Sequence, residues 1–552
     1  TIPGILVKNI FVDKGANSVL QGFESIAGQI NVVLKTPADG NRLLLNTYLN
    51  SFGEEQYNAN FRHRWNRWST LVSGHLTRPA NVRDRDEDTF LDVPQVERYA
   101  LYNKWQYRNP NEWGKHATIS LRYVQEQRQG GQTFFAAERD VSTTNAYGQV
   151  VQFAQPEFSA KLGYRLDDYH HFVLQLSGFY HDQSSVFGTT FYDAIHQNAY
   201  ANAQYELNWR DHYQLKTGVS YRLQDLREDV RFSAADLLDR AYEGVYHKQE
   251  YIPGFFVENV SNWYEDRLTL ITGLRWDHHH QYGGRWTPRL LLKGNLTPTT
   301  VVRASAGSGW RTLNLFAENV NILAGNRNVF IAEDLVPEAA WNYGLNLTHN
   351  TYGEHVEAQF SLDLYRTSFE NQIFPDYETD ATVVTINNFF GTSISNAAQM
   401  ELGLAFFDRL GLKMAYNYLD VYREVDGKKQ QLPFNAKHRV AAACNFEPLT
   451  KAWHLDADFH WFGQQELVNA GSDGQAERSD PYSVFNIQFT KVWTKLEVYV
   501  GCENAFDFRQ LRPIRSWQNP FDPLFDPSNV WGPTKGREFH IGARYQLDYL
   551  NK

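Results

Sequence analysis

Hydrophobic and polar residues alternate along most of this chain. In the segment 539–547, which reads F-H-I-G-A-R-Y-Q-L, every odd position is apolar, and the even positions carry His540, Arg544 and Gln546 around one glycine. Because successive side chains of a β-strand point to opposite faces, the pattern predicts a strand with one apolar and one polar face. The segment has the length of about 9–11 residues that a tilted strand needs to cross a bilayer.

The same alternation recurs at intervals along the chain. It is clear at 356–364, 400–406, 485–489 and 496–502, and no helical pattern separates the alternating segments. We count about 22 strands, an even number within the range of outer-membrane barrels. The sequence therefore predicts an all-β fold, an antiparallel transmembrane β-barrel of about 22 strands whose outer face contacts the outer-membrane lipids.

The connections between the predicted strands supply a second signal. We expect them to alternate strictly between short turns, as at 64–67 and 167–170, and long loops, as at 79–95, 183–195 and 507–536. Outer-membrane barrels have short periplasmic turns and longer extracellular loops. Aromatic residues gather beside the short turns, which is typical of a membrane interface; they are Trp65, Trp68, Trp113, Trp209, Trp263, Tyr264, Phe406, Phe407, Trp453 and Trp493.

Composition excludes several other classes of protein. The mean hydropathy is negative, and the chain has no run of about 20 apolar residues that would make a transmembrane helix. A net charge of −10 disfavours a nucleic-acid binder. We find no catalytic triad, phosphate-binding loop or zinc-ligand spacing, so an enzyme is not expected. The two cysteines, Cys444 and Cys502, lie at apolar positions of separate predicted strands and are expected to be unpaired.

The first forty residues do not fit the barrel pattern. They are rich in glycine and end at an Asp39-Gly40 hinge, which predicts two domains, 1–40 and 41–552. The segment 13–35 reads D-K-G-A-N-S-V-L-Q-G-F-E-S-I-A-G-Q-I-N-V-V-L-K and resembles the end of the plug domain of TonB-dependent outer-membrane receptors. Ser25 and Gln29 depart from the family pattern; the matching positions are Gly15, Ser18, Gly22, Ile26, Gly28, Ile30, Asn31, Val32 and Lys35.

Motifs within the predicted barrel agree with this resemblance. The segments 286–289 (W-T-P-R), 307–311 (G-S-G-W-R) and 335–338 (L-V-P-E) are similar to family motifs in the same order, and 525–533 is similar to receptors from Bacteroidota. The resemblance implies a barrel in the outer membrane of a Gram-negative bacterium. It also implies import of a ligand bound outside, with TonB and the proton-motive force opening a path. No TonB box is recognisable, so this mechanism is expected of a fuller chain.

One strand end carries candidate ligand-binding residues. His278, His280 and Tyr282 lie at the outer end of a predicted strand, and at most two neighbouring histidines share a face. One interpretation is that these residues bind a metal or haem. The alternative is that they form a solvated, polar strand end. Where haem receptors of the family carry F-R-A-P and N-P-D-L, this chain has W-R-T-L at 310–313 and N-R-N-V at 326–329, which disfavours haem. Arg311 and Arg327 stay as candidate ligand-binding residues.

The first long loop is acidic. Asp84, Asp86 and Asp88 alternate with Arg85 and Glu87. Carboxylate oxygens suit Ca²⁺, as in cobalamin receptors of this family. The alternative is a solvated acidic loop in which the neighbouring arginines neutralise the charge.

The last long loop combines arginine with aromatic residues. Arg512, Arg515 and Trp517 would suit an anionic, aromatic metal complex through charge and stacking. Alternatively, the loop packs against its own aromatic side chains.

Two functions are therefore expected. The first is a TonB-dependent importer of a scarce nutrient, expected to be a ferric siderophore or related metal complex. The second is a structural or assembly subunit of a larger outer-membrane complex without active uptake. A surface lipoprotein or another outer-membrane subunit is an expected partner in either case, and nucleic acid is not.

Overall fold

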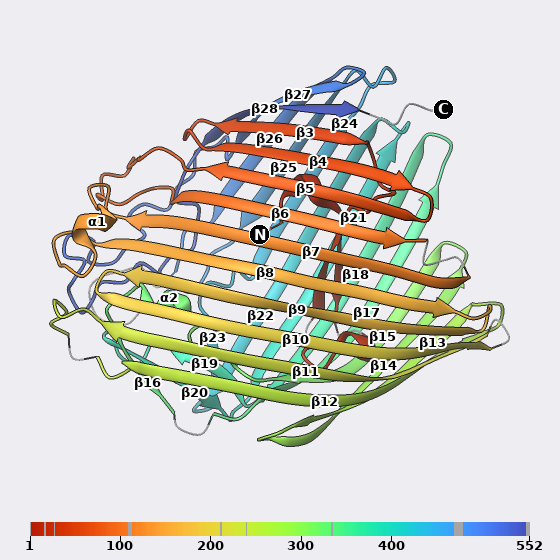
Figure 1. Ribbon diagram of the computed structural model, residues 1–552, viewed down its shortest axis with the longest axis horizontal. Helices are drawn as coiled ribbons and strands as arrows, with labels where there is room; N and C mark the ends of the chain where they lie inside the picture. The colour runs from red at the N-terminus through yellow and green to blue at the C-terminus, as the bar shows by residue number, and fades with distance from the viewer. Residues whose placement is uncertain are drawn as a thin grey trace.

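The chain forms one large closed β-barrel. The computed structural model describes residues 2–15, 18–26, 28–108, 113–209, 212–238, 240–332, 335–468 and 478–547. Its main sheet closes on itself through 22 antiparallel strands (Figure 1). The all-β class and the strand number expected from the sequence are both confirmed. Among the described residues, no helix is long and apolar enough to cross a membrane.

The barrel strands follow one another in chain order around the wall. They are β3 (Leu43–Asn50), β4 (Glu55–Trp65), β5 (Trp68–Arg78), β6 (Gln95–Tyr107), β7 (Gly114–Gly131), β8 (Gly148–Arg165), β9 (His170–Phe187), β10 (Thr190–Trp209), β11 (Tyr213–Phe232), β12 (Gly244–Trp263), β13 (Leu268–His279), β14 (Gly283–Thr297), β15 (Thr300–Arg311), β17 (Glu338–Tyr352), β18 (Val356–Glu370), β21 (Ser393–Phe406), β22 (Leu410–Val425), β24 (His438–Phe446), β25 (Trp453–Phe462), β26 (Tyr482–Val492), β27 (Leu496–Glu503) and β28 (Glu538–Leu547). The short β23 (Lys428–Gln431) pairs with the upper part of β22, above β24.

Smaller elements lie inside the barrel or among its loops. Two strands, β1 (Val7–Lys14) and β2 (Gly28–Leu34), form a separate hairpin with the short turns η1 (Gly4–Leu6) and η2 (Val19–Gln21). Among the loops are α1 (Ala137–Asp140), α2 (Val320–Leu323) and a three-stranded sheet of β16 (Asn328–Ile331), β19 (Gln372–Asp376) and β20 (Val383–Phe389). Figure 1 shows the loop elements together at the left rim.

The barrel closes where its last strand meets its first. Strand β28 pairs with β3 from His540↔Asn50 to Leu547↔Leu43. Phe539 and Ile541 are exposed on the outer face, whereas Arg544 points inward and forms an ion pair with Glu497, Nη1 to Oε2, at 2.8 Å. The alternation in 539–547 therefore separates a lipid-facing side from a lumen-facing side.

The two rims differ, but not in the expected strict alternation. Connections at one rim span at most six residues, and the other rim carries the long segments 312–337, 371–392 and 504–537. The long loop expected at 183–195 is wrong, because β9 and β10 stay paired as far as Phe187 and Thr190. Gly188 and the polar residues around it interrupt the alternation there, so the segment resembles a loop in sequence. Strands of 18–20 residues from β7 to β12 extend well beyond the length that crosses a bilayer.

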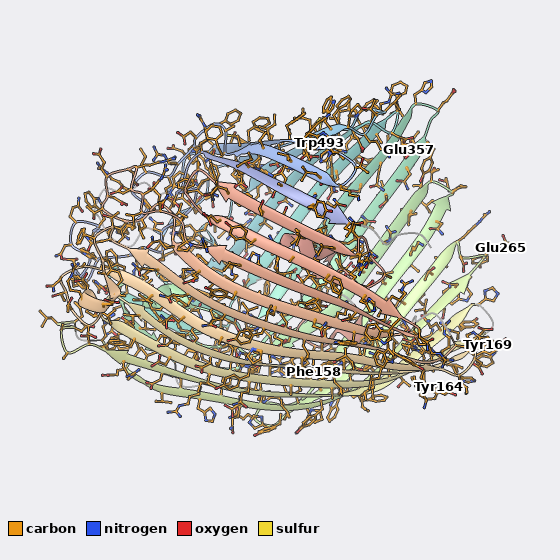
Figure 2. All side chains as sticks on the ribbon, turned by 45° about the horizontal axis from the view of Figure 1, so that its top comes forward. Phe158, Tyr164, Tyr169, Glu265, Glu357 and Trp493 are labelled. Carbon is orange, nitrogen blue, oxygen red and sulfur yellow. The ribbon has the colours of Figure 1, made fainter. Side chains whose placement is uncertain are left out.

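The short-turn rim is rich in exposed aromatic side chains. Trp209, Tyr264, Phe407 and Trp493 are all exposed there, and Figure 2 labels Tyr164, Tyr169 and Trp493 at the same rim. Amphipathic rings settle at the headgroup level of a membrane. This arrangement marks one edge of the membrane-spanning band.

The closing seam gives a test of barrel stability. A Cβ at Gly542 would lie 2.1 Å from Cζ of Tyr499 and 2.5 Å from the backbone oxygen of Thr47. We expect Gly542→Val to destabilise the barrel by about 1–3 kcal/mol, as overpacking does. The measurement is the temperature at which the folded barrel loses its resistance to SDS on a gel.

Gly294 in β14 is the matched control for this variant. A Cβ there meets nothing within 4 Å, so Gly294→Val is expected to unfold at the wild-type temperature. Equal unfolding temperatures for the two variants would contradict close packing at the seam.

Candidate functional site

The barrel lumen contains a hairpin. Strands β1 and β2 pair antiparallel from Lys14↔Gly28 to Val7↔Leu34, and they lie inside the barrel wall (Figure 1, dark red). An isolated two-stranded sheet is marginally stable in water. The hairpin and the segment that connects its two strands are instead held by polar side chains of the wall.

Arg289 of β14 is the central contact between wall and hairpin. Its guanidinium donates from Nη1 to the backbone oxygen of Ser18 at 2.6 Å and from Nη2 to that of Gly22 at 2.9 Å. A third, longer bond of 3.3 Å reaches the backbone oxygen of Ser25. Arg289 therefore satisfies three carbonyls of an irregular segment, and bonds from a charged donor are stronger than those between neutral groups.

An inner-facing ion pair supports the same segment. Arg275 and Asp277 of β13 are buried and joined Nη2 to Oδ1 at 2.6 Å, and Arg275 also donates to the backbone oxygen of Val19. On the neighbouring strand, Glu258 accepts a hydrogen bond of 2.5 Å from the Ser18 hydroxyl. Because each of these charged groups has a partner, burial in the lumen is compensated.

Further contacts fix both ends of the internal segment. Lys14 forms an ion pair with Asp363 at 2.6 Å, and Glu24 forms one with Arg222 at 2.5 Å. Phe23 stacks on Trp310 with ring centroids 4.3 Å apart. Contacts from several strands of the barrel wall thus converge on Lys14 and on residues 18–25.

The glycines of the plug-like motif have a geometric role. Gly15 has φ of +81°, and a Cβ there would lie 2.8 Å from Cε1 of Tyr365. Gly28 has φ of +147°, and its Cβ would lie 2.7 Å from the backbone oxygen of Asp13. Only glycine adopts such backbone angles at so close an approach without strain. Of the other motif residues, Ile30 and Asn31 lie in β2, opposite Val12 and Phe11 of β1.

The predicted histidine site divides between two faces. His278 and His280 lie on the outer face, where their rings contact Trp276 and Tyr251. The residue that points into the lumen is His279, whose Nε2 lies 3.3 Å from Oε1 of Glu250. Tyr282 contacts the His279 ring and donates from its hydroxyl to the backbone oxygen of Leu335. The structure therefore does not bring His278, His280 and Tyr282 together.

The two predicted arginines of the 312–337 region form ion pairs. Arg311 lies between Glu318 and Glu338, at 2.8 and 2.6 Å. Arg327 is buried and its Nη2 lies 3.0 Å from Oδ2 of Asp526. These contacts join the loops, with Arg327 connecting the 312–337 segment to the last long loop.

The last long loop packs on a cluster of aromatic side chains. Trp517 lies against a core of Phe90, Tyr147 and Phe525. The Arg515 amide donates to the backbone oxygen of Asp526 at 3.0 Å, and the exposed Arg512 contacts Asp86 through its own backbone amide. The aromatic side chains of the last long loop therefore pack together with Phe90 and Tyr147 of two other loops.

The acidic loop does bring three carboxylates together. Oxygens of Asp84, Asp86 and Asp88 lie within 4.8 Å of one another. Burial, followed by repulsion from Asp86, Asp84 and Asp92, raises the pKa of Asp88 to about 6, although the Phe90 amide donates to it. These donors are the oxygen ligands that Ca²⁺ prefers, and calcium binding here stays a prediction.

Sequence reasoning missed an aromatic pocket on the inner wall. His460 and Phe462 of β25 and Tyr482 of β26 border a hollow of about 500 Å³ with the loop residues Trp531 and Gly532. The residues come from three separate segments, so no local motif indicates them. The sequence does show that aromatic residues at the ends of these two strands fall on inward-facing positions, and this pattern could have indicated the pocket.

The fold and wall chemistry define the class of protein. A closed barrel with an apolar outer face, a polar lumen and one short-turn rim is an outer-membrane β-barrel. Residues 35–505 match the family model of the TonB dependent receptor-like β-barrel. The chain belongs to the TonB-dependent receptor family and is an outer-membrane protein.

Comparisons with known proteins agree with this assignment. The chain is 29% identical over 110 residues to an iron-regulated outer membrane virulence protein of Vibrio cholerae, which is 20% of this chain and 16% of that protein. It is 22% identical over 273 residues to the ferric enterobactin receptor of Pseudomonas aeruginosa, which is 44% of this chain and 36% of that receptor. The chain thus matches well under half the length of either curated relative.

Solved structures show the same fold over nearly the whole chain. The ferric enterobactin receptor of Pseudomonas aeruginosa superposes with a TM-score of 0.74 at 16% identity, covering 99% of this chain and 86% of that one. A siderophore receptor from Acinetobacter baumannii gives 0.71 at 13% identity, covering 99% and 86%. A copper transporter gives 0.72 at 14%, covering 98% and 86%. The relatives are receptors and transporters rather than enzymes.

The Arg289 contacts lead to a prediction about the internal segment. Replacing Arg289 by alanine removes three hydrogen bonds from a charged donor, each worth about 1.5–3 kcal/mol. We expect amide exchange across residues 18–26 to become at least tenfold faster, while the barrel strands keep wild-type protection. Hydrogen–deuterium exchange with mass spectrometry measures both.

Arg366 serves as the control for Arg289. It lies in β18 with an exposed side chain and a single hydrogen bond of 3.5 Å to Asn396. Arg366→Ala is expected to leave exchange in 18–26 unchanged. Wild-type exchange there in Arg289→Ala would show that the arginine does not hold the segment.

The raised pKa of Asp88 predicts a pH dependence of the acidic loop. A carboxyl group whose pKa is higher in the folded state stabilises that state at low pH, and this stabilisation is lost as pH rises through about 6. Opening of loop 79–94, measured by amide exchange corrected for intrinsic rates, should therefore increase from pH 4.5 to pH 7. Asp88→Asn should remove most of this dependence.

The same loop tests the calcium prediction. Ca²⁺ favours ionised carboxylates, so millimolar Ca²⁺ at pH 7 should slow exchange in the wild type and not in Asp88→Asn. If Ca²⁺ does not change amide exchange in this loop of the wild type, the result contradicts calcium binding and favours a solvated acidic loop.

Proposed function

We propose that this chain forms the barrel of an importer for a ferric siderophore or a related metal complex, driven by TonB and the proton-motive force. The observation that carries the proposal is the internal hairpin, held in the lumen by side chains rather than by strand pairing with the wall. Such contacts break and re-form without opening the barrel sheet. A pulling force can therefore displace the internal segment while the barrel stays closed.

We infer further that residues 1–40 are the C-terminal end of a plug domain. Their side chains support this, because Ile10, Val12 and Ile30 of the hairpin are 60%, 60% and 70% exposed. Clustered apolar side chains with this exposure mark a surface that packs against something else. The remainder of a plug would cover this face.

The chemical class of the ligand comes from the relatives. Their names specify ferric enterobactin, siderophores and copper. The shared chemistry is a scarce transition metal, mostly as a chelate, and this chain is proposed to take the same class. A scaffold role without uptake has no observation in its favour, and a surface lipoprotein stays a predicted partner.

Uptake by cells tests the proposal. We expect a strain that lacks the complete gene to lose accumulation of at least one ⁵⁵Fe-siderophore complex, and the restored gene to return it. A protonophore or deletion of TonB should abolish the restored uptake. Normal accumulation of every complex in the deletion strain, together with loss of an outer-membrane assembly, would overturn import and favour the scaffold role.

A further inference from the structure

An aromatic pocket lies on the inner wall at the loop rim. We define it by Phe462 at the end of β25, Tyr482 at the start of β26, and Trp531 in the last long loop, with His460 at its edge. Phe462 and Tyr482 are paired in register. On the same two strands, Trp461 and Phe485 belong to the opposite, lipid-facing set. The pocket therefore opens towards the lumen, beneath the loops.

The rings of the pocket form an ordered stack. Phe462 and Tyr482 are stacked with centroids 4.8 Å apart, and Tyr482 stacks on Phe508 at the same distance with an interplanar angle of 9°. Trp531 lies tilted beside Tyr482 at 5.9 Å. The arrangement leaves a preformed aromatic ledge of fixed geometry.

Side-chain hydrogen bonds to the loop backbone hold the loop side of the pocket in place. The buried Gln510 accepts hydrogen bonds at Oε1 from the amides of Trp531 and Gly532, at 2.8 and 3.1 Å, and donates from Nε2 to the oxygen of Asn529. The backbone oxygen of Trp531 accepts from Gln465 at 3.0 Å. Trp531 is thus held in position, although no secondary structure surrounds it.

A cation lies beside the stack. The Arg439 guanidinium lies 5.9 Å from the Phe462 ring centroid, and its Nε is buried with no hydrogen-bond partner. Within the described part of the chain, no carboxylate forms an ion pair with Arg439. Asp458 of β25 lies 3.3 Å from His460, Oδ2 to Nε2. The pocket therefore pairs an aromatic ledge with a positive charge that has no balancing anion.

We propose that this pocket binds a planar aromatic group bearing negative charge, such as a catecholate arm of the imported metal complex. The inference rests on the proposed import function and narrows its ligand class. Contact with Trp531 and with the edge of the Tyr482 ring, which is itself stacked between Phe462 and Phe508, supplies affinity for the ligand ring. Arg439 supplies the counter-charge. A quaternary ammonium ligand is disfavoured, because Arg439 already lies against the Phe462 ring and repels a second cation.

Position supports a role in capture. Phe462 and Tyr482 lie at the loop rim, whereas Lys14 and residues 18–25 of the internal segment bind the wall on other strands. A ligand that enters between the loops meets this pocket on the wall of the lumen. The aromatic side chains lining it are half-buried rather than covered, so a ligand ring has access.

Binding of two iron complexes to the purified protein tests the proposal. The probes are ⁵⁵Fe with 2,3-dihydroxybenzoate, an aromatic anion, and ⁵⁵Fe with acetohydroxamate, which has no ring. We expect the aromatic complex to bind at least tenfold more tightly. Tyr482→Leu and Trp531→Leu should each weaken it about three- to tenfold, the measured worth of one aromatic pair, and Arg439→Gln should weaken it similarly.

Matched controls separate binding from folding. Trp461→Leu and Phe485→Leu alter aromatic residues on the outer face of the same strands and should leave both affinities unchanged. Resistance of each variant to SDS confirms that the barrel has folded. Equal binding of both complexes, unchanged by Tyr482→Leu, would overturn the proposal, as would preferential binding of choline.

Failure of this inference is distinct from failure of import. Cells that take up the hydroxamate complex through this protein as well as the aromatic one would overturn the aromatic pocket and leave the importer standing. If gene deletion leaves the uptake of both complexes unchanged while the purified protein still binds the aromatic complex, import is overturned instead.

Discussion

Closure of the backbone hydrogen-bond network in lipid is the constraint on which this structure depends. Unpaired amide and carbonyl groups are costly in a bilayer, so a sheet that spans it must have no free edge. The pairing of β28 with β3 removes the last edge. Once the ring is closed, the two-residue period of every strand assigns each side chain to lipid or to the lumen. Glu497 of β27 and Arg544 of β28, for example, face each other on the inner side of the wall, next to the seam.

The closed wall also determines how the lumen can be filled. The backbone groups of the wall strands pair mainly with one another, so the internal segment attaches to the wall mainly through side chains. Arg289 and Arg275 act in this way, since both donate to backbone carbonyls of the irregular segment 18–25. A backbone hydrogen bond from the Trp310 amide to the oxygen of Phe23 is added to these contacts. Attachment through long charged side chains is specific and reversible. This suits a segment that has to be held firmly at rest and displaced during transport.

Much of the fold followed from the sequence because the membrane imposes a simple period. The inward and outward assignment of 539–547 was predicted correctly, and so was the strand number. The 183–195 loop was not. The strands stay paired there, and Phe187, Tyr192 and Ala194 are buried against residues of the long loops rather than following the pattern of a membrane-spanning strand. The candidate site was predicted less well. Arg327 was chosen as a ligand-binding residue, yet its partner Asp526 lies some two hundred residues away and is invisible to local motifs.

The aromatic residues show why register matters more than residue type in this fold. Trp461 and Phe462 are neighbours in sequence, but one faces lipid and the other faces the lumen. The first needs no explanation beyond the membrane, whereas an aromatic side chain on the aqueous side requires a partner. Phe462 has Tyr482 and the guanidinium of Arg439 as partners, and the pocket between them and Trp531 still has room for a ring. A count of aromatic residues does not distinguish those that face lipid from those that face the lumen. Residues that recognise a ligand are therefore to be sought on the inner face of the wall.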